Sequence, residues 1–396
     1  MELRLSNLAK TYPASGIRKM FDLAAGYDDV IALTLGEPNF ETPAYIKEAA
    51  KKALDENYTH YAPNAGLPVL REAIAKRYQK SHWAGYKAEN VIVTVGALEG
   101  LTLGMLALLN PGDEILVPDP GFANYYGQAK IVGAVPVPVP AHEENGFNMT
   151  VADIEKCITP KTKAIMITNP GNPTGTCLTE AQMKMLLDVA VAHDLYLVAD
   201  EVYREFTYDG EPLHSFGKFD YGQENLILID SVSKRFSACG ARIGCLISRN
   251  REFMANALKY CQARLSVATL DQIAAAALYS VGPEYFEQVR QEYKRRRDTV
   301  VRKLHEIPGV ICECPRGAFY LMAALPDDDA EKFQLWLLQE FEDCGDTVMF
   351  SAGEPFYATP GKGRSEIRIA YVLKQEDLER AMDLLALGIR KYNETH

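Results

Sequence analysis

Two short segments, Ser231-Val232-Ser233-Lys234 and Gly240-Ala241-Arg242-Ile243-Gly244, follow an apolar run at Leu226–Ile229 that predicts a buried strand. Serine hydroxyls and an arginine suit a phosphate group, because arginine offers a planar fork of hydrogen-bond donors. A lysine beside them can form a Schiff base with an aldehyde. Although a lysine after a strand is more often a surface charge, the combination indicates a ligand that carries both an aldehyde and a phosphate.

The overall composition limits the possible functions. With 42 Lys and Arg against 53 Asp and Glu, the 396-residue chain has a formal net charge of −11. Such an acidic chain is not expected to bind nucleic acid or an anionic membrane. The start of the sequence lacks the apolar core of a signal peptide, and no apolar run reaches the length of a membrane span.

The eight cysteines and seven histidines show no metal-binding pattern. No cysteines form a C-x-x-C pair and no histidines stand in an H-x-x-x-H spacing, so we expect no metal site. Scattered single thiols in a chain of this length are typical of a reducing compartment, and we therefore expect a cytoplasmic protein.

From about residue 45 the sequence alternates helix-like and strand-like segments, which predicts an α/β fold. The strand-like runs are continuously apolar, as in a mainly parallel sheet that is covered on both faces. After Ile307, short strands and helices are mixed. We predict an N-terminal segment (1–40) that packs with the small domain, a large domain (41–285) around the parallel sheet, and a smaller α+β domain (286–396).

The periodic segments give approximate element positions. Strands are predicted at 91–95, 114–117, 163–168, 195–199, 225–230, 243–248, 317–322, 348–350 and 366–371. Helices are predicted at 44–54, 67–79, 97–109, 252–263, 270–281, 283–307, 330–344 and 375–392. The four consecutive basic residues at 294–297 are interpreted as a solvated helix face.

Small and polar residues follow the predicted strands, at the carboxyl ends where open α/β sheets bind ligands. Gly96-Ala97-Leu98 opens a helix, and free backbone N–H groups there suit a phosphate. Phe122 could stack on a flat ring, with a core position as the alternative. The loop Asn169-Pro170-Gly171-Asn172-Pro173-Thr174-Gly175 is stiffened by its prolines and could hold the Asn172 amide in place.

Asp200 and Tyr203 follow the strand at 195–199. A carboxylate at a buried strand end needs a partner, for which a protonated pyridine nitrogen is suitable, and a helix N-cap is the alternative. Tyr203 could donate a hydrogen bond to a phenolate oxygen. Five strand ends thus supply a phosphate nest, an aromatic ring, an amide, a carboxylate and a lysine, which together indicate pyridoxal 5′-phosphate.

On these motifs the chain resembles the class I/II aminotransferases, which are fold-type I enzymes dependent on pyridoxal 5′-phosphate. The resemblance extends from Leu35-Gly36-Glu37-Pro38-Asn39-Phe40 to Arg368-Ile369-Ala370-Tyr371. It implies transfer of an amino group between an α-amino acid and a 2-oxo acid through a pyridoxamine phosphate form of the cofactor. It also implies a homodimer with shared active sites.

The resemblance implies a role for each site residue. Lys234 would bind the cofactor aldehyde and then carry the transferred proton, and Asp200 would keep the pyridine nitrogen protonated. Arg368 would bind the substrate α-carboxylate, while Gly36 approaches the substrate with its backbone. The other cofactor contacts would come from Asn172 and Tyr203 at the phenolate oxygen, Phe122 on the ring face, Gly96, Ala97, Leu98, Ser231, Ser233 and Arg242 at the phosphate, and Tyr61 at the phosphate of the neighbouring subunit.

Two stretches depart from the family pattern. Leu98 stands where many relatives have Ser or Thr, which predicts one missing hydrogen bond to the phosphate. Residues 350–357 do not match the usual Pro-Gly-rich loop before the arginine, which leaves the pocket shape there open.

Other functions compete with transamination. A carbon–sulfur β-lyase has the same fold and motifs and stays open. A non-catalytic regulator would need a DNA-binding segment, for which the region before residue 40 is too short, and a nicotinamide enzyme would need a G-x-G-x-x-G after a strand. The segment 13–21 resembles an apolar entrance helix, which favours neutral or aromatic amino donors with a dicarboxylic 2-oxo acid as acceptor.

Overall fold

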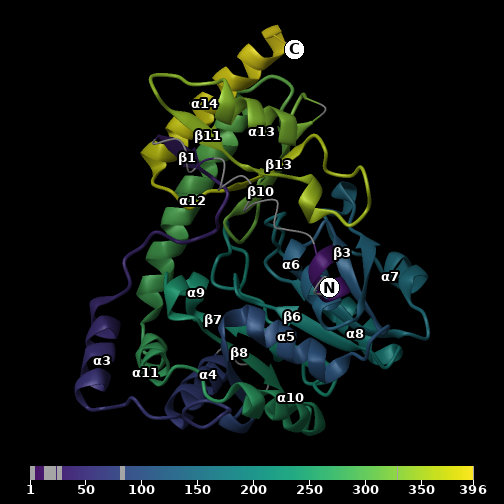
Figure 1. Ribbon diagram of the computed structural model, residues 1–396, viewed down its shortest axis with the longest axis vertical. Helices are drawn as coiled ribbons and strands as arrows, with labels where there is room; N and C mark the ends of the chain where they lie inside the picture. Colours follow the sequence, from purple (N-terminus) through teal and green to yellow (C-terminus); the bar gives the residue numbers. More distant parts are fainter. Residues whose placement is uncertain (1–4, 13–23, 25–28, 81–84, 328, 396) are drawn as a thin grey trace, which may run out of the picture.

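A seven-stranded sheet lies at the centre of the computed structural model, which describes residues 5–12, 24, 29–80, 85–327 and 329–395 (Figure 1). The strand order is β2 (Val91–Val95), β8 (Ile243–Ser248), β7 (Leu226–Ser231), β6 (Tyr196–Asp200), β5 (Thr162–Thr168), β3 (Glu114–Asp119) and β4 (Val135–Pro140). β8 alone runs antiparallel to the other six strands of this sheet. The carboxyl ends of β2, β7, β6, β5 and β3 therefore lie at the same end of the sheet, and the predicted fold class is confirmed.

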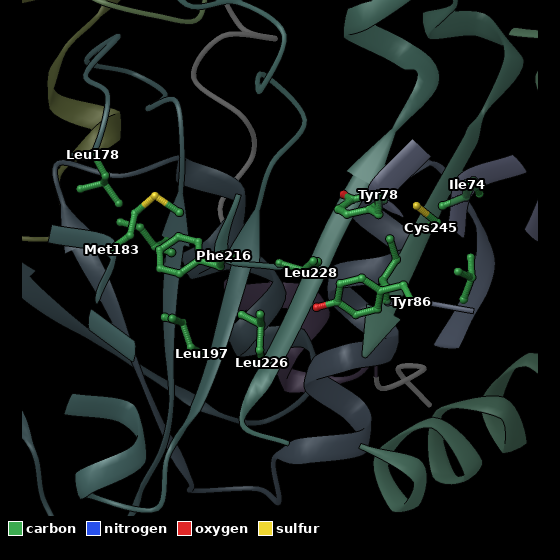
Figure 2. Packing of buried hydrophobic residues seen from close by; sticks show 14 of the residues in the cluster. Ile74, Tyr78, Tyr86, Leu178, Met183, Leu197, Phe216, Leu226, Leu228 and Cys245 are labelled. Carbon is green, nitrogen blue, oxygen red and sulfur yellow. The ribbon is translucent and has the colours of Figure 1, made fainter. Parts of the chain in front are cut away.

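The inner strands are buried on both faces, which explains their unbroken apolar runs. Along β7, Leu226 and Leu228 belong to one hydrophobic cluster, whereas Ile227 and Ile229 belong to another. Because successive strand residues point to opposite faces, a strand covered by helices on both sides is apolar at each position. Figure 2 shows the first cluster, which also contains the ring of Phe216.

Helices connect the strands and cover the sheet. They are α3 (Ala44–Asp55), α4 (Pro68–Lys80), α5 (Gly96–Leu108), α6 (Ala123–Ile131), α7 (Val151–Cys157), α8 (Glu180–Ala192), α9 (Val232–Arg235), α10 (Arg251–Arg264) and α11 (Thr269–Leu278). None of the helices in the described ranges is long and apolar enough to cross a membrane.

The C-terminal part forms a second, smaller unit with a four-stranded antiparallel sheet. Its strands are β12 (Ser351–Ala352), β13 (Glu366–Ala370), β10 (Tyr320–Ala324) and β9 (Ile311–Cys312), in that order. Its helices are α13 (Ala330–Gln339) and α14 (Gln375–Thr395). The long helix α12 (Pro283–His305) runs between the two units (Figure 1).

The described residues among the first 40 contact both units. β1 (Val30–Ala32) pairs in parallel with β11 (Thr347–Met349) of the smaller unit. After α1 (Asn7–Thr11), the hydroxyl of Tyr12 lies against Gly127 in α6, where a Cβ atom would collide with it. We propose residues 40 and 285 as domain boundaries, the second of which falls in the first turn of α12.

Four of the described strands were not predicted from the sequence: the short strands β1, β9 and β12, and the longer strand β4. β4 has the sequence Val-Pro-Val-Pro-Val-Pro, in which proline occupies every second position. It lies at the edge of the sheet and pairs only with β3. An edge strand tolerates proline, because the missing N–H groups can face away from the ladder.

The prediction that residues 294–297 form a solvated face is wrong for half of the run. The side chains of Arg296 and Arg297 are only 5% and 2% exposed. Arg296 donates to Asn39 Oδ1 (2.9 Å), and Arg297 donates to Asp209 Oδ2 (2.6 Å). Because α12 packs along both units, its inner face buries charged groups that are paired with partners from other segments.

Candidate functional site

The register of the sheet gathers the residues that were predicted to bind a phosphate. Val95 pairs with Ile243 and Ser231 pairs with Gly244, so Gly96, Ser231 and Arg242 lie close together. Gly96 has a φ of +71°, and a Cβ atom there would collide with the Arg242 guanidinium. The first turn of α5 has no side-chain cap, which leaves its backbone N–H groups available to an anion.

The two serines of the lysine segment are buried and contact one another. Ser231 Oγ lies 2.8 Å from Ser233 Oγ and 2.9 Å from the Ile243 carbonyl. Ser231 also accepts a hydrogen bond from the Ser233 N–H (3.1 Å) and thereby orients the turn that leads to Lys234. In the first turn of α5, the apolar side chain of Leu98 is 36% exposed and leaves only its backbone N–H as a donor.

Asp200 ends β6 as a buried carboxyl group. It accepts hydrogen bonds from Tyr125 Oη (2.8 Å) and from the Val202 N–H (3.2 Å). Burial raises the pKa of Asp200 from 3.8 to about 7, although both hydrogen bonds lower it. Residues 202–205 form turns rather than a helix, so the N-cap interpretation does not apply. None of the described basic side chains pairs with Asp200, which leaves it suited to a cationic ligand.

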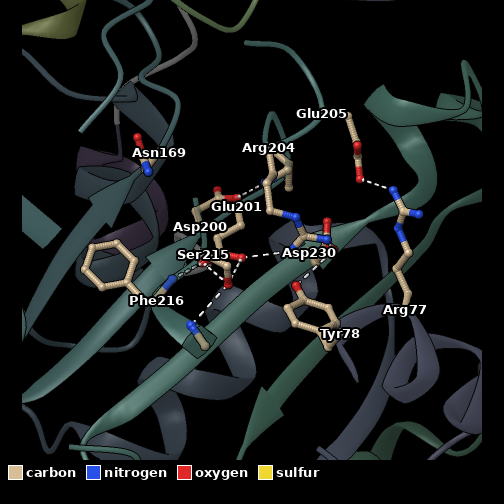
Figure 3. Close-up of polar contacts among 12 residues, drawn as sticks. Arg77, Tyr78, Asn169, Asp200, Glu201, Arg204, Glu205, Ser215, Phe216 and Asp230 are labelled. Carbon is tan, nitrogen blue, oxygen red and sulfur yellow. Dashed lines mark hydrogen bonds and ion pairs between the residues drawn. The ribbon is translucent and has the colours of Figure 1, made fainter. Parts of the chain in front are cut away.

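Six charged side chains, five of them buried, form a network that begins at Glu201, beside Asp200, and that sequence reasoning missed. Figure 3 labels Arg77, Glu201, Arg204, Glu205 and Asp230 of this network. Arg204 pairs with Glu201 (2.8 Å) and lies 3.5 Å from Asp230. Arg235, the residue after Lys234, also pairs with Asp230. The other two members are Arg77 and Glu205, which pair at 2.7 Å. The network balances three positive and three negative groups.

This network has two consequences for the site. Because the Arg235 side chain is fully buried against Asp230, it anchors α9, the short helix that also carries Lys234. The carboxylates of Asp230 and Glu201 also raise the pKa of Asp200. Buried charges such as these follow no periodic pattern in the sequence, so they could not be predicted from it. Their positions were nevertheless close to predicted site residues, since Glu201 follows Asp200, Arg204 follows Tyr203 and Asp230 precedes Ser231.

Lys234 is brought next to the N-terminal segment. Its Nζ donates to the Gly36 carbonyl (2.7 Å) and lies 3.8 Å from Cys239 Sγ. A Cβ atom on Gly36 would collide with the hydroxyl of Tyr320. The close approach of the three groups therefore requires glycine at position 36.

Arg368 lies in β13 and is 3% exposed. It donates to Asn172 Oδ1 (3.1 Å) and to the Thr34 carbonyl (2.5 Å), and Ser351 Oγ lies 3.4 Å away. Within the described parts of the chain it has no carboxylate partner, and its Nε has no hydrogen-bond partner. Burial lowers the pKa of this guanidinium. A buried cation without an anion is suited to a ligand that supplies a carboxylate.

Two aromatic rings that the sequence did not single out complete the surroundings of Arg368. Tyr320 and Phe356 lie 4.5 and 4.7 Å from its guanidinium carbon. The hydroxyl of Tyr320 is 3.0 Å from that of Tyr203. The stretch 350–357, whose contribution was left open, thus supplies Ser351 and Phe356 to the pocket.

Of the remaining predicted residues, Phe122 lies in the site and Tyr61 does not. Phe122 precedes α6 and meets Tyr125 edge-to-face, with ring centroids 5.3 Å apart, and Tyr125 in turn contacts Asp200. Tyr61 is 84% exposed and has no hydrogen bond or ring contact with other described residues. The segment 13–21, which was used to predict the donor, lies outside the described residues.

These residues fit pyridoxal 5′-phosphate. Gly96, Arg242 and the start of α5 form a cradle for its phosphate, because any side chain at Gly96 would fill that space. Asp200 lacks a cation and can hold a protonated ring nitrogen. Lys234 can reach an aldehyde between these two points, and Asn172 and Tyr203 can bond the phenolate oxygen. In the described ranges, no three His, Cys, Asp or Glu side chains gather as a metal site would require.

Comparison with known proteins gives extensive matches. The family model "Aminotransferase class I and II" matches residues 28–385. The chain is 37% identical to an aspartate aminotransferase of Pyrococcus horikoshii over 93% of both sequences. It is also 37% identical to an aromatic-amino-acid aminotransferase of Thermococcus litoralis over 96% of this chain and 97% of the relative.

Solved structures match the fold over nearly the whole chain. The aspartate aminotransferase of Thermus thermophilus with maleate superposes with a TM-score of 0.87 at 31% identity, covering 98% of this chain and 100% of that one. The aromatic aminotransferase of Pyrococcus horikoshii gives a TM-score of 0.85 at 34% identity, with 94% and 99% coverage.

Proposed function

This chain belongs to the class I and II aminotransferases, which use pyridoxal 5′-phosphate, and we propose that it exchanges an amino group between a neutral or aromatic α-amino acid and a dicarboxylic 2-oxo acid. The observation that carries the proposal is Arg368, a buried cation without a carboxylate partner among the described residues. Its neighbours Tyr320 and Phe356 give the pocket aromatic walls. The Thermus thermophilus relative with maleate supports a dicarboxylate as one of the two substrates.

Each of the site side chains has a separate role in the proposed reaction. When bound, the cofactor supplies an aldehyde that bonds amino groups and a cationic ring that accepts electrons. Arg368 binds the substrate α-carboxylate and so fixes the direction of the Cα–H bond. Lys234 Nζ takes the proton from Cα, and the Gly36 carbonyl holds that amine in place at 2.7 Å. Asp200 holds a proton on the ring nitrogen.

A panel of amino acids tests the proposed substrates. The yellow purified protein is mixed with each amino acid in a single turnover, and the cofactor absorbance is followed. We expect neutral or aromatic amino acids to bleach the absorbance and a dicarboxylic 2-oxo acid to restore it. Release of pyruvate, ammonia and a thiol without an acceptor would instead identify a β-lyase, and no response to any amino acid would contradict the proposal.

Replacing Arg368 by leucine is expected to raise the KM for the amino donor about 10- to 100-fold, because a charge-assisted pair is lost. The kcat at saturation changes less, because the arginine binds ground and transition states alike. Steady-state kinetics measures both constants. An amine that lacks the α-carboxylate is the control substrate, and it should react equally poorly with both proteins.

We further propose a homodimer in which Tyr61 reaches the phosphate of the other subunit. The loop carrying Tyr61 is fixed to its own chain, since Ala62 N–H donates to Ser266 Oγ (3.2 Å) and Thr269 Oγ1 donates to the His60 carbonyl (2.8 Å). Its ring is 84% exposed, so it is free to contact a second subunit. Other exposed apolar side chains, Leu54, Tyr58, Val69 and Leu265, offer surface for a second copy.

Tyr61→Phe is expected to weaken cofactor affinity about 10-fold through the loss of one hydrogen bond to a charged group. Spectroscopic titration with the cofactor measures this affinity. Mixing Tyr61→Phe with Lys234→Ala should restore wild-type affinity at one of the two sites of each hybrid dimer, because that site combines the native Lys234 of one subunit with the native Tyr61 of the other. No recovery in the mixture would show that Tyr61 does not act across a subunit interface.

We also propose that the protein works in a reducing compartment, the cytoplasm. All eight cysteines lie in the described part of the chain, and each is a free thiol. Burial raises the pKa of Cys177, Cys239 and Cys312, which keeps these thiols protonated and unreactive.

A further inference from the structure

Asp119, at the end of β3, joins the large unit to the loop that precedes β13. Its Oδ1 accepts a hydrogen bond from the Ala358 N–H (2.6 Å). Its Oδ2 accepts from the Thr359 N–H (3.3 Å) and from the Thr359 hydroxyl (2.5 Å). Nearly 240 residues separate these partners in the sequence. We call the contacts of Asp119 with Ala358 and Thr359 the clasp.

Further bonds hold both sides of the clasp. Tyr126 Oη lies 2.8 Å from the Pro118 carbonyl and 3.3 Å from Asp119 Oδ1, which fixes the carboxylate from α6. Gly121 N–H donates to the Phe356 carbonyl (2.9 Å). An ionised carboxylate only accepts hydrogen bonds, so it suits this set of N–H and O–H donors.

The clasp joins the two walls of the site. Phe356, three residues before Thr359, is 1% exposed and covers the Arg368 guanidinium at 4.7 Å. Phe122, three residues after Asp119, was assigned to the face of the cofactor ring. Phe356 is one of the groups that bury Arg368, which is only 3% exposed, so the position of this loop affects how a substrate carboxylate reaches the guanidinium.

We propose that Asp119 is a positioning residue that holds Phe356 over Arg368 and so sets how tightly the site retains a substrate carboxylate. This inference rests on the proposed role of Arg368. With the clasp intact, the loop closes over Arg368 and its ligand. Without it, the loop opens more often and the carboxylate leaves faster, while the groups that move the proton stay in place.

The test uses the cofactor-loaded protein and maleate as a non-reacting dicarboxylate probe. We expect Asp119→Ala to raise the Kd of maleate about 10-fold, whereas kcat at saturating substrate changes less than about 3-fold. Thr359→Val removes one of three donors and should have a smaller effect, and Thr359→Ser keeps the hydroxyl and should behave like wild type. Hydrogen exchange of the amides at 354–360 should become faster in Asp119→Ala.

A double-mutant cycle shows whether Asp119 acts through Phe356. If it does, Asp119→Ala adds no further loss of maleate affinity to Phe356→Ala, because the two residues form one unit. Additive effects would overturn the inference, and so would an unchanged Kd in an Asp119→Ala protein whose loop exchanges faster. Unchanged exchange would show that the clasp does not hold the loop. Arg368→Leu separates the two claims, since normal maleate binding in that variant would overturn the role of Arg368 itself.

Discussion

Replacing Lys234 by alanine is expected to lower kcat by about 10⁴-fold or more, because it removes both the nucleophile for the cofactor aldehyde and the base at the substrate Cα. The geometry supports both roles, since Nζ lies 2.7 Å from the Gly36 carbonyl, at the meeting point of the cofactor and substrate residues. Steady-state rates measure the loss. Mass spectrometry after borohydride reduction should show the cofactor attached to the wild-type chain and not to the variant.

Two controls separate lost chemistry from lost structure in this variant. Lys234→Arg keeps a positive charge but cannot bond the aldehyde, so it should be as inactive as the alanine variant. A small primary amine added to Lys234→Ala should restore part of the proton transfer, since the space left by the side chain can admit it. A Lys234→Ala protein that kept more than about a hundredth of wild-type activity would contradict the assignment of Lys234 as the base.

The strand ends could be predicted from the sequence for a physical reason. A strand covered on both faces is apolar throughout, so the first polar residue after it marks the end of the sheet where ligands bind. Asp200 and Lys234 were found in this way. Arg368 and Gly36 lie outside the central sheet, and they were assigned through the family resemblance alone.

Other residues of the site could not be recognised from the sequence pattern. Tyr320 lies in an antiparallel strand of the smaller unit, and only the packing of that unit on the sheet brings its hydroxyl to Tyr203. Arg296 was interpreted as a solvated charge and Arg235 was not singled out, because Asn39 and Asp230, which contact them, stand at no characteristic spacing in the sequence. Long-range pairs between charged groups have no period in a single sequence, unlike the apolar faces of helices and strands.

Asp200→Asn is expected to lower kcat about 10³-fold, because the variant can no longer stabilise a proton on the ring nitrogen by charge. The same substitution should stabilise the cofactor-free protein at high pH. Asp200 has a pKa of about 7 in the folded chain against 3.8 in an ordinary environment, so burial favours its neutral form. An amide is neutral at every pH and avoids the cost of a buried charge.

The sign of the pH dependence follows from proton binding. Between pH 3.8 and about 7 the folded chain holds a proton on Asp200 that the unfolded chain has lost, so this group makes the free energy of unfolding fall as pH rises through that window. The difference between the two pKa values corresponds to ~4 kcal/mol at 1.36 kcal/mol for each pH unit. Between pH 4 and pH 8, the free energy of unfolding of Asp200→Asn should therefore rise relative to that of the wild-type protein by about the same amount.

Denaturant unfolding of both cofactor-free proteins across this pH range measures the difference. The amide of the Asp200→Asn variant provides one acceptor fewer for Tyr125 or for the Val202 N–H, but that loss is the same at every pH and leaves the slope unchanged. Adding the cofactor should make the wild-type protein the more stable of the two at pH 8, because the cationic ring nitrogen pairs with the ionised carboxylate and not with the amide. A difference that stays flat with pH would mean that Asp200 is ionised throughout, and it would then need a cationic partner other than the cofactor.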